Sequence, residues 1–440
     1  MNDRQPPQPT NPQGRILLLD TTRGFALLGI LLMNILGFGL LSPAYSWPGF
    51  DVDAQGGADR VLWIVVELFG EGSMRGLFSL LFGAGVVLFT TGPGARGAAI
   101  HYRRMFVLLL FGLFDAYVLL WYGDILICYA LCGALLYPLR NWRPRSLLLL
   151  AGIVTLLCSV SYGGLQVLLQ YARDAAGTVA ESGDPAALDP GLREAARGWL
   201  GFSADYFLGP QALEAERAAR AGSYASAFAW NLEQTNAMLL FVMPLFLLWD
   251  ALLMMLLGMA LYKLGVLGGR VSAWGGQLMA ALGLSAGLVI NGLQVSSALH
   301  HNLDLLSSFA QLTWSYHLGR IAESLGYVGL LAWLLHTPWL HGLLTRLAAV
   351  GRMALSNYLL QSVIGLFLFT GAGLGLVGEL SRAQLYLVVL GIWLLQLWLS
   401  PLWLARWRFG PVEYLWRWLT YGRRPALTRA APGAGAAPGG

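Results

Sequence analysis

The sequence predicts an all-α, polytopic transmembrane helical bundle with about ten spanning helices. Of its 440 residues, 57% are hydrophobic and only 12% are charged, whereas a soluble domain carries about 25% charged residues. Residues 24–41 contain no ionisable side chain, and about 20 such residues cross the hydrocarbon core of a bilayer as a helix. Because lipid offers no hydrogen bonds, each helix must satisfy its own backbone amides, and the sequence lacks the alternation of a transmembrane strand.

Apolar segments of spanning length recur along the chain. The expected spans are residues 16–41, 74–92, 102–121, 122–139, 146–171, 236–263, 272–292, 314–336, 349–370 and 383–404. We expect the first to be an uncleaved helix, because it lacks the small-residue cleavage site of a signal peptide. Residues 56–73 are also fairly apolar, and we expect them to form either an interfacial helix or an outward extension of the second span.

Arginine and lysine gather in every second connection between these spans. Because cytoplasmic loops carry the excess of basic residues, these connections and both termini are predicted to be cytoplasmic. The predicted organisation is a disordered cytoplasmic tail (1–14), an N-terminal bundle of about five helices (15–171), an extracytoplasmic helical loop (172–235), a C-terminal bundle of about five helices (236–404) and a basic cytoplasmic tail with a disordered end (405–440).

The composition argues against several classes of function. The net charge of +5 does not indicate nucleic-acid binding, because the basic residues lie in short connections between apolar segments. Cys128, Cys132 and Cys158 lie in apolar segments without further ligands nearby, so we expect no metal site and no structural disulfide. The histidines do not cluster at metal-binding spacing. No Walker, HExxH or GxSxG motif is present, and no bound cofactor is expected.

A polar stripe marks the first expected helix. At about 100° per residue, Asp20, Arg23 and Asn34 fall on one face that begins at the cytoplasmic end. Polar residues within a membrane helix are costly, so the stripe is a candidate for a cytoplasmic polar or donor-binding site. Alternatively, Asp20 caps the helix and Arg23 extends to the interface.

A second stripe lies on the eighth expected helix. Tyr316, Arg320, Glu323 and Tyr327 share one face of this helix, and His317 lies on the adjacent face. Two charges with two tyrosines on one stripe are typical of the lining of a polar cavity. Alternatively, Arg320 and Glu323 form a structural ion pair with each other.

Other polar residues interrupt the apolar segments. Asp250 lies near the middle of the sixth span, where it would be protonated or would contact an arginine. Asp115 lies toward the outer end of the third span. Asp124 follows a tight turn, and capping the next helix could be its whole role. The remaining candidates for a polar cavity are Glu71 and Arg75, at the outer end of the second span, and Asn357, whose amide could simply join two helices.

The chain also carries five ordered motifs. They are residues 19–30 (LDTTRGFALLGI), 78–85 (FSLLFGAG), 121–126 (WYGDIL), 351–362 (GRMALSNYLLQS) and 410–417 (GPVEYLWR). These motifs resemble those of the YeiB-like bacterial membrane proteins, a family of unknown function, and the resemblance covers about residues 15–424. It implies a multi-pass protein of the bacterial cytoplasmic (inner) membrane.

The family is similar in turn to the wider membrane acyltransferases, mainly through the Asp/Arg-Gly motif of the first helix. This resemblance implies transfer of an acyl group from a cytoplasmic donor, with acyl-CoA as co-substrate, to an extracytoplasmic sugar or lipid. Under this hypothesis, Arg23 would attract the donor's phosphates, and Asp115 would be the general base on the acceptor hydroxyl. Arg320, with Glu323 in the same group, would stabilise the oxyanion or hold the base. Relatives often carry His at the position of Asp115, so Asp115 would have to replace it.

Two other functions stay open from the sequence. A transporter or lipid-handling protein would use Asp250 and the pair of Arg320 and Glu323 as ion or substrate sites, without covalent chemistry. A scaffold would bind an envelope partner through residues 172–235. The lipid bilayer is the expected partner in every case, and an envelope glycan or lipid is the expected substrate of the enzyme.

Overall fold

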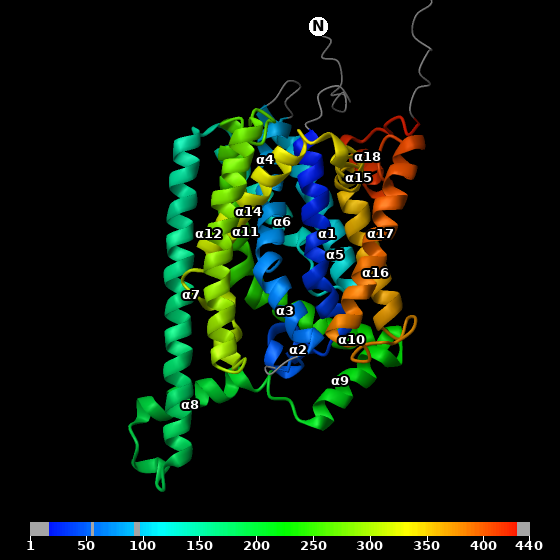
Figure 1. Cartoon of the computed structure of the whole chain (residues 1–440). Helices are drawn as coiled ribbons and strands as arrows, with labels where there is room; N and C mark the ends of the chain where they lie inside the picture. Colours follow the sequence, from blue (N-terminus) through cyan, green and yellow to red (C-terminus); the bar gives the residue numbers. More distant parts are fainter. Residues whose placement is uncertain (1–16, 54–56, 92–96, 429–440) are drawn as a thin grey trace, which may run out of the picture.

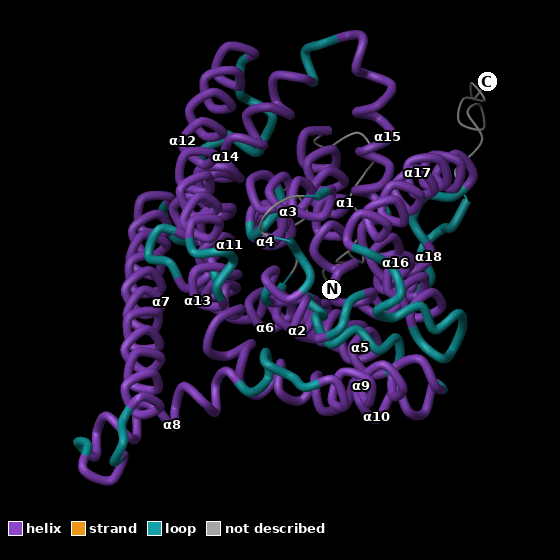
Figure 2. The backbone as a smooth tube through the Cα atoms, turned by 60° about the horizontal axis from the view of Figure 1, so that its bottom comes forward, coloured by secondary structure: helices purple, strands orange, loops and turns teal. Residues whose placement is uncertain are grey.

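In this computed structural model, residues 17–53, 57–91 and 97–428 are described, and they form helices and no β-strand (Figure 2). The all-α prediction is confirmed; the expected tail at 1–14 and the last part of the tail at 405–440 lie outside the described residues. The helices of the first half are α1 (Leu17–Gly39), α2 (Ser42–Ser46), α3 (Ala58–Phe69), α4 (Ser73–Thr91), α5 (Ala98–Tyr117), α6 (Leu126–Leu136), α7 (Pro144–Glu181), α8 (Pro190–Ser203), α9 (Pro210–Gly222) and α10 (Tyr224–Ala237). Those of the second half are α11 (Leu248–Lys263), α12 (Ala273–His300), α13 (Leu305–Ser308), α14 (Tyr316–Leu334), α15 (His341–Arg352), α16 (Ala354–Phe369), α17 (Arg382–Arg406) and α18 (Pro411–Tyr421).

The number of spanning helices is smaller than the sequence predicted. Among the described residues, six helical segments are long and apolar enough to cross a membrane, and a bent pair raises this number to seven if it counts as one span. The six are Leu17–Gly39, Ala58–Thr91, Pro144–Glu181, Tyr224–Lys263, Ala273–His300 and Arg382–Arg406, and the bent pair is Tyr316–Leu334 with Pro338–Arg352, which meet at 103°. The prediction of about ten was therefore too high.

Three expected spans do not meet the length or the apolar character of a spanning helix. Helices α6, with 11 residues, and α16, with 16 residues, are shorter than the roughly 20 residues that cross the hydrocarbon core. Helix α5 has 20 residues but carries Arg103, Arg104 and Asp115. Figure 1 shows these three helices among the longer ones. Their apolar side chains therefore pack in large part against other helices, where the hydropathy of the sequence had predicted contact with lipid.

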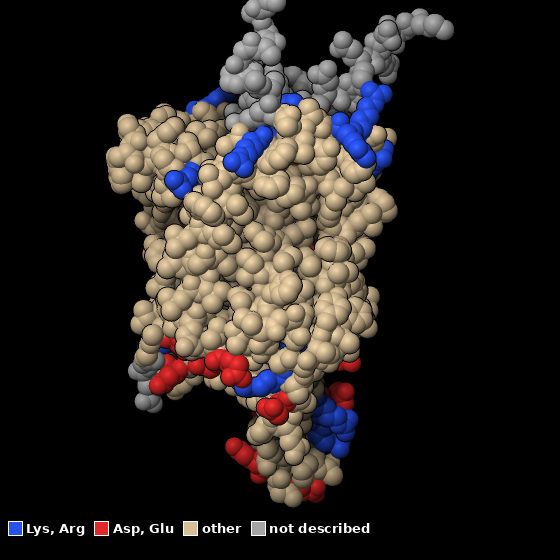
Figure 3. All heavy atoms as spheres, turned by 90° about the vertical axis from the view of Figure 1, so that its right-hand side faces the viewer, with Lys and Arg blue, Asp and Glu red and all other residues tan. Residues whose placement is uncertain are grey.

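The two ends of the bundle differ in charge. Lys and Arg mark one end, Asp and Glu are prominent at the other, and the surface between them is almost free of charge (Figure 3). We call these the basic end and the acidic end. The start of α1 and the end of α18 both lie at the basic end (Figure 1). Basic residues favour the cytoplasmic side, which supports cytoplasmic termini; the orientation itself stays a prediction.

The segment between the two expected bundles is helical and lies at the acidic end. Helix α7 continues to Glu181, beyond the expected end at 171, and projects from the bundle together with α8 (Figure 1). Helix α9 returns beneath the bundle, where buried Arg220 donates hydrogen bonds to the carbonyls of Gly37, Phe38 and Leu40. These carbonyls end α1 and have no partner within the helix, so Arg220 fixes α9 to the end of α1.

Helix pairs such as α4 with α11 and α1 with α15 pack closely enough to exclude any side chain at the contact. A Cβ atom on Gly83 of α4 or on Gly258 of α11 would overlap a backbone carbonyl of the partner helix. The same reciprocal arrangement joins α1 and α15 through Gly24 and Gly351. Small residues allow the close van der Waals contact that holds helices together in lipid. The contact of α4 with α11 also sets the distance between the polar residues on these helices.

The orientation can be tested by placing single cysteines at the two ends. Ala187 lies in the connection between α7 and α8, which projects at the acidic end, and Arg423 follows α18, which ends at the basic end (Figure 1). Both residues are exposed, whereas the three native cysteines are buried. If the basic end faces the cytoplasm, a membrane-impermeant maleimide should label Ala187→Cys in intact cells. It should label Arg423→Cys only after permeabilisation, and the opposite pattern would invert the topology.

Candidate functional site

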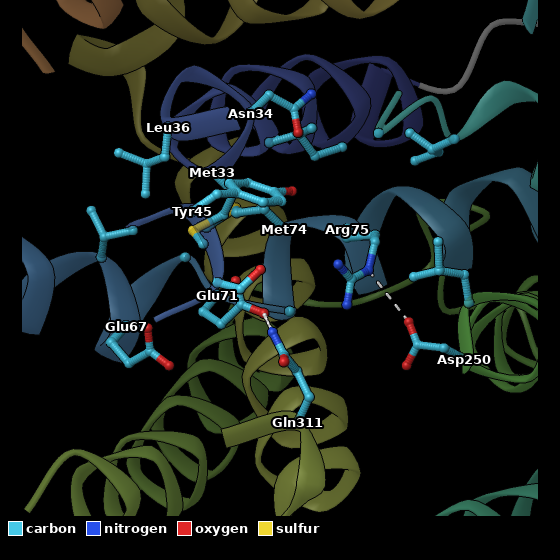
Figure 4. A pocket seen from close by; sticks show the side chains of 18 of the residues that line it. Met33, Asn34, Leu36, Tyr45, Glu67, Glu71, Met74, Arg75, Asp250 and Gln311 are labelled. Carbon is cyan, nitrogen blue, oxygen red and sulfur yellow. Dashed lines mark hydrogen bonds and ion pairs between the residues drawn. The ribbon is translucent and has the colours of Figure 1, made fainter. Parts of the chain in front are cut away.

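A cavity of about 190 Å³ opens between the second half of α1, the junction of α3 and α4, the first turn of α11 and the start of α17. We call it the acidic-end cavity, because these segments lie toward the acidic end (Figure 1). Figure 4 shows Asn34, Glu67, Glu71 and Arg75 around it. Its polar and charged lining includes Asn34, Tyr45, Glu67, Glu71, Arg75, Asp124, Asp250, Gln311, Arg382 and Tyr386.

A buried carboxylate on α11 pairs with two arginines, of which Arg75 lines this cavity. Asp250 forms ion pairs with Arg75 of α4, at 3.4 Å, and with Arg320 of α14. Nδ1 of His317 lies 3.5 Å from the same carboxylate. Arg320 and His317 are almost fully buried, whereas the Arg75 side chain keeps 33% of its surface exposed. The expectation that Asp250 contacts an arginine is confirmed.

Arg75 is positioned by a second chain of contacts. Its guanidinium donates to the hydroxyl of Tyr316 at 3.1 Å, and this hydroxyl donates to Glu71 at 3.2 Å. The amide of Gln311 also donates to Glu71 at 3.2 Å. Because Arg75 is held by Asp250 on one side and Tyr316 on the other, its guanidinium stays beside the cavity (Figure 4).

Glu323 belongs to a separate network. Its carboxylate accepts hydrogen bonds from the amide of Asn291 at 2.9 Å, from the hydroxyl of Tyr327 at 3.0 Å and from the hydroxyl of Ser73. The ion pair with Arg320 that the sequence left open does not form, because Arg320 turns toward Asp250. Glu323 therefore joins α4, α12 and α14, and both of its carboxylate oxygens accept hydrogen bonds in this network.

Asp115 of α5 and Asp124, just before α6, form a separate pair of carboxyl groups. Asp124 accepts the backbone N–H of Ile127 at 2.9 Å, as a capping carboxylate does, and lies 3.5 Å from the hydroxyl of Tyr358. Asp115 is fully buried and lies against Asp124 and Ser362. The expected catalytic set of Asp115, Arg320 and Glu323 is therefore not one cluster.

The stripe on α1 is also divided. Asp20 and Arg23 form an ion pair at 3.1 Å, and Arg23 lines a second cavity, whereas Asn34 lines the acidic-end cavity. Asn34 thus does not belong to a cytoplasmic donor site. Asn357 donates to the carbonyl of Val350 and to the hydroxyl of Ser400, which fits the structural role of an amide that joins helices.

The second cavity has a volume of about 140 Å³ and lies toward the basic end, so we call it the basic-end cavity. Its polar and charged lining includes Arg23, His101, Arg104, Arg352 and Glu413. The guanidinium of Arg104 lies 4.6 Å from the ring centre of Phe89 and 4.4 Å from that of Trp416. Cation–π contacts of this kind orient a guanidinium.

Glu413 lines the same cavity from α18, outside the spanning helices. Its carboxylate accepts the backbone N–H groups of Leu355 and Ser356, at 2.7 and 3.1 Å, and so caps the start of α16. Burial raises the pKa of this carboxyl above its ordinary value, and these hydrogen bonds oppose the increase. A carboxylate occupied in this way leaves the cavity predominantly basic.

The two cavities share part of their wall. Ile30, Ile125 and Tyr129 line both of them, and the hydroxyl of Tyr129 is tied to that of Ser79 at 2.6 Å. The two cavities are therefore chambers that approach each other from opposite ends of the bundle and share a largely apolar wall. We call Ile30, Ile125 and Tyr129 the shared wall. The acidic-end cavity has many polar and charged lining residues, whereas the basic-end cavity is lined mostly by apolar residues with a few charged ones.

Sequence reasoning missed several residues that line the cavities. Arg104 was counted only as part of a basic connection, and His101 was set aside for lack of metal-binding spacing. Glu67 and Arg382 lie at helix positions that look interfacial. The signal that could have found Arg104 is its spacing of three residues from His101, which places both on one face of α5.

The fold and the two opposed cavities define a polytopic α-helical membrane protein with polar sites toward both ends. The chain belongs to the YeiB family. It is 30% identical to the uncharacterized protein YeiB of Escherichia coli over 95% of this chain and 99% of the relative. It is also 30% identical to the uncharacterized protein YxaH of Bacillus subtilis over 94% and 96%. The family described as a protein of unknown function (DUF418) matches residues 261–423, and no solved structure matches the chain.

Removal of the charge on Asp250 should destabilise the fold. Asp250→Asn leaves Arg75 and Arg320 without their counter-charge, and breaking a buried ion pair costs about 3–5 kcal/mol. Thermal unfolding of the purified protein in detergent should therefore shift to a clearly lower temperature. Asp205→Asn, the same change at an exposed position, is the matched control, and equal unfolding temperatures would contradict the role of Asp250.

Proposed function

We propose that the protein is an acyltransferase of the bacterial cytoplasmic membrane. Acyl-CoA would bind in the basic-end cavity, and an extracytoplasmic sugar or lipid would present its hydroxyl in the acidic-end cavity. The observation that carries this proposal is the shared wall of Ile30, Ile125 and Tyr129, which brings the two chambers together. Donor and acceptor can each stay on their own side of the membrane while their reacting atoms meet.

The basic-end cavity suits an anionic donor. Arg23 and Arg104 line it, and arginine binds phosphate with a planar set of donors. Helix α1 leads from Arg23, near the basic end, to Ile30 at the shared wall, and Leu108 also lines the route. A phosphate held by the arginines therefore places an attached acyl chain along an apolar path toward the acceptor.

The geometry moves the proposed base from Asp115 to Asp124. Asp124 lines the acidic-end cavity and directly precedes Ile125 of the shared wall. The acceptor oxygen attacks the thioester carbonyl, the new C–O bond forms, and the C–S bond breaks. Asp124 takes the proton of the acceptor hydroxyl, and the sulfur leaves as a thiolate that water protonates. Asp115, buried against Asp124, acts as a positioning residue.

A transporter is the second candidate, and one observation favours it. A ten-residue π-helix, Met238–Leu247, contains Pro244 and runs directly into α11, which carries Asp250. Irregular helices next to buried charges are typical of substrate sites in transporters. If this function is the correct one, proton-coupled uptake should vanish in Asp250→Asn while acyl-CoA binding is absent.

Donor binding is the first test of the acyltransferase proposal. The purified protein should bind acyl-CoA with saturable, micromolar affinity, and Arg23→Ala should weaken binding by about tenfold or more, because a charged hydrogen bond contributes roughly 1.5–3 kcal/mol. Arg173→Ala, at the acidic end, is the control and should bind normally. No binding to the wild-type protein at millimolar concentration would overturn the proposal.

The base can be tested separately from the donor site. Asp124→Asn should reduce transfer from labelled acyl-CoA to envelope glycans and lipids in membrane vesicles by about 10²–10⁴-fold, the range of general-base catalysis. Acyl-CoA binding should be unchanged. Asp115→Asn should cause a smaller loss of transfer, and normal transfer by Asp124→Asn would remove this residue from the base role.

A further inference from the structure

A buried histidine lines the basic-end cavity with one nitrogen unused. His101, in the first turn of α5, is 1% exposed. Its Nε2 atom lies 2.9 Å from the carbonyl oxygen of Gly133, and its ring centre lies 4.9 Å from that of Tyr137, with the two rings tilted by 31°. Among the described residues, no side chain or backbone group forms a hydrogen bond with Nδ1.

These contacts define what Nδ1 can do. A carbonyl oxygen only accepts hydrogen bonds, so Nε2 must carry the proton, and in the neutral ring Nδ1 is left with a lone pair. Arg104, one turn further on the same helix face, disfavours a second positive charge on the ring. A buried acceptor without a partner costs free energy, so Nδ1 is suited to receive an N–H or O–H group from a ligand.

The neighbouring arginines and this nitrogen require different chemistry. Arg23 and Arg104 are donors and attract anionic oxygens. Nδ1 repels such oxygens and selects a neutral hydrogen-bond donor. A simple polyanion satisfies only the arginines, whereas a nucleotide-bearing ligand such as CoA carries hydroxyl and amino groups close to its phosphates and satisfies both.

We propose that His101 is a specificity-determining residue of the basic-end cavity, whose Nδ1 accepts a hydrogen bond from a hydroxyl or amino group next to the phosphates of the donor. This inference rests on the proposed function, because it assumes that acyl-CoA is the ligand of this cavity. A purely structural role of His101 would use only Nε2, whereas the proposal also gives Nδ1 a role.

The test compares two ligands on matched variants by isothermal titration of the purified protein. CoA carries both phosphates and neutral donors, and trimetaphosphate is anionic without a proton at neutral pH. In His101→Gln the side-chain amide can still donate to Gly133, but its acceptor Oε1 is bonded to the same carbon as the donating nitrogen and does not take the place of Nδ1. CoA should bind about three- to tenfold more weakly to His101→Gln, the effect of one hydrogen bond, and trimetaphosphate should bind as in the wild type.

Two further variants make the outcome decisive. Arg104→Gln should weaken both ligands, and His101→Phe, which keeps the ring contact with Tyr137, should repeat the selective loss of CoA. If both His101 variants bind CoA with the affinity of the wild type, this inference alone is overturned. It is also overturned if the two variants lose affinity for CoA and for trimetaphosphate equally. Failure of the wild type to bind CoA while trimetaphosphate still binds would overturn the proposed function itself.

Discussion

The arrangement of this bundle depends on one buried carboxylate. Asp250 of α11 pairs with both Arg75 of α4 and Arg320 of α14 at a depth where an unpaired charge is very costly. Three helices are thereby held in one register, because a shift of any of them would leave an arginine unpaired. Glycine contacts between α4 and α11 allow this approach, and the same register places the partly exposed Arg75 at the acidic-end cavity.

The wall between the two cavities favours an uncharged transferred group, as the proposed function requires. Both cavities carry charged residues, but the shared wall of Ile30, Ile125 and Tyr129 offers a single hydroxyl, which is already bonded to Ser79. An ion crossing such a wall would lose its hydration without gaining replacement ligands. An acyl group is uncharged and apolar, so it meets no comparable barrier. Under the proposed function, the wall would separate the charged parts of donor and acceptor and would let the transferred group pass.

Hydropathy predicted the all-α class and the segments of the six longest spans, because apolar length is a local property. It overestimated the number of spans because a short buried helix is as apolar as a lipid-facing one. The sequence predicted that Asp250 would be protonated or would contact an arginine, since a lone carboxylate in an apolar segment must be neutralised. The partners of Arg320 and Glu323 were not predictable, because periodicity shows which residues share a helix face but not which helix lies opposite. For the same reason Asp115 was grouped with Arg320, although its neighbour is Asp124.

The pairing of two carboxyl groups also bears on the family pattern that this chain resembles, in which His often stands at the position of Asp115. Asp115 is fully buried, so it affects an acceptor only through Asp124, which lines the cavity. Two adjacent carboxyl groups cannot readily both ionise, so under the proposed function a proton held by Asp115 would be available to orient Asp124. An imidazole N–H at the same position would donate to Asp124 in the same way. Under the proposed function, either side chain would orient the carboxyl group of Asp124, and neither would have to reach the substrate.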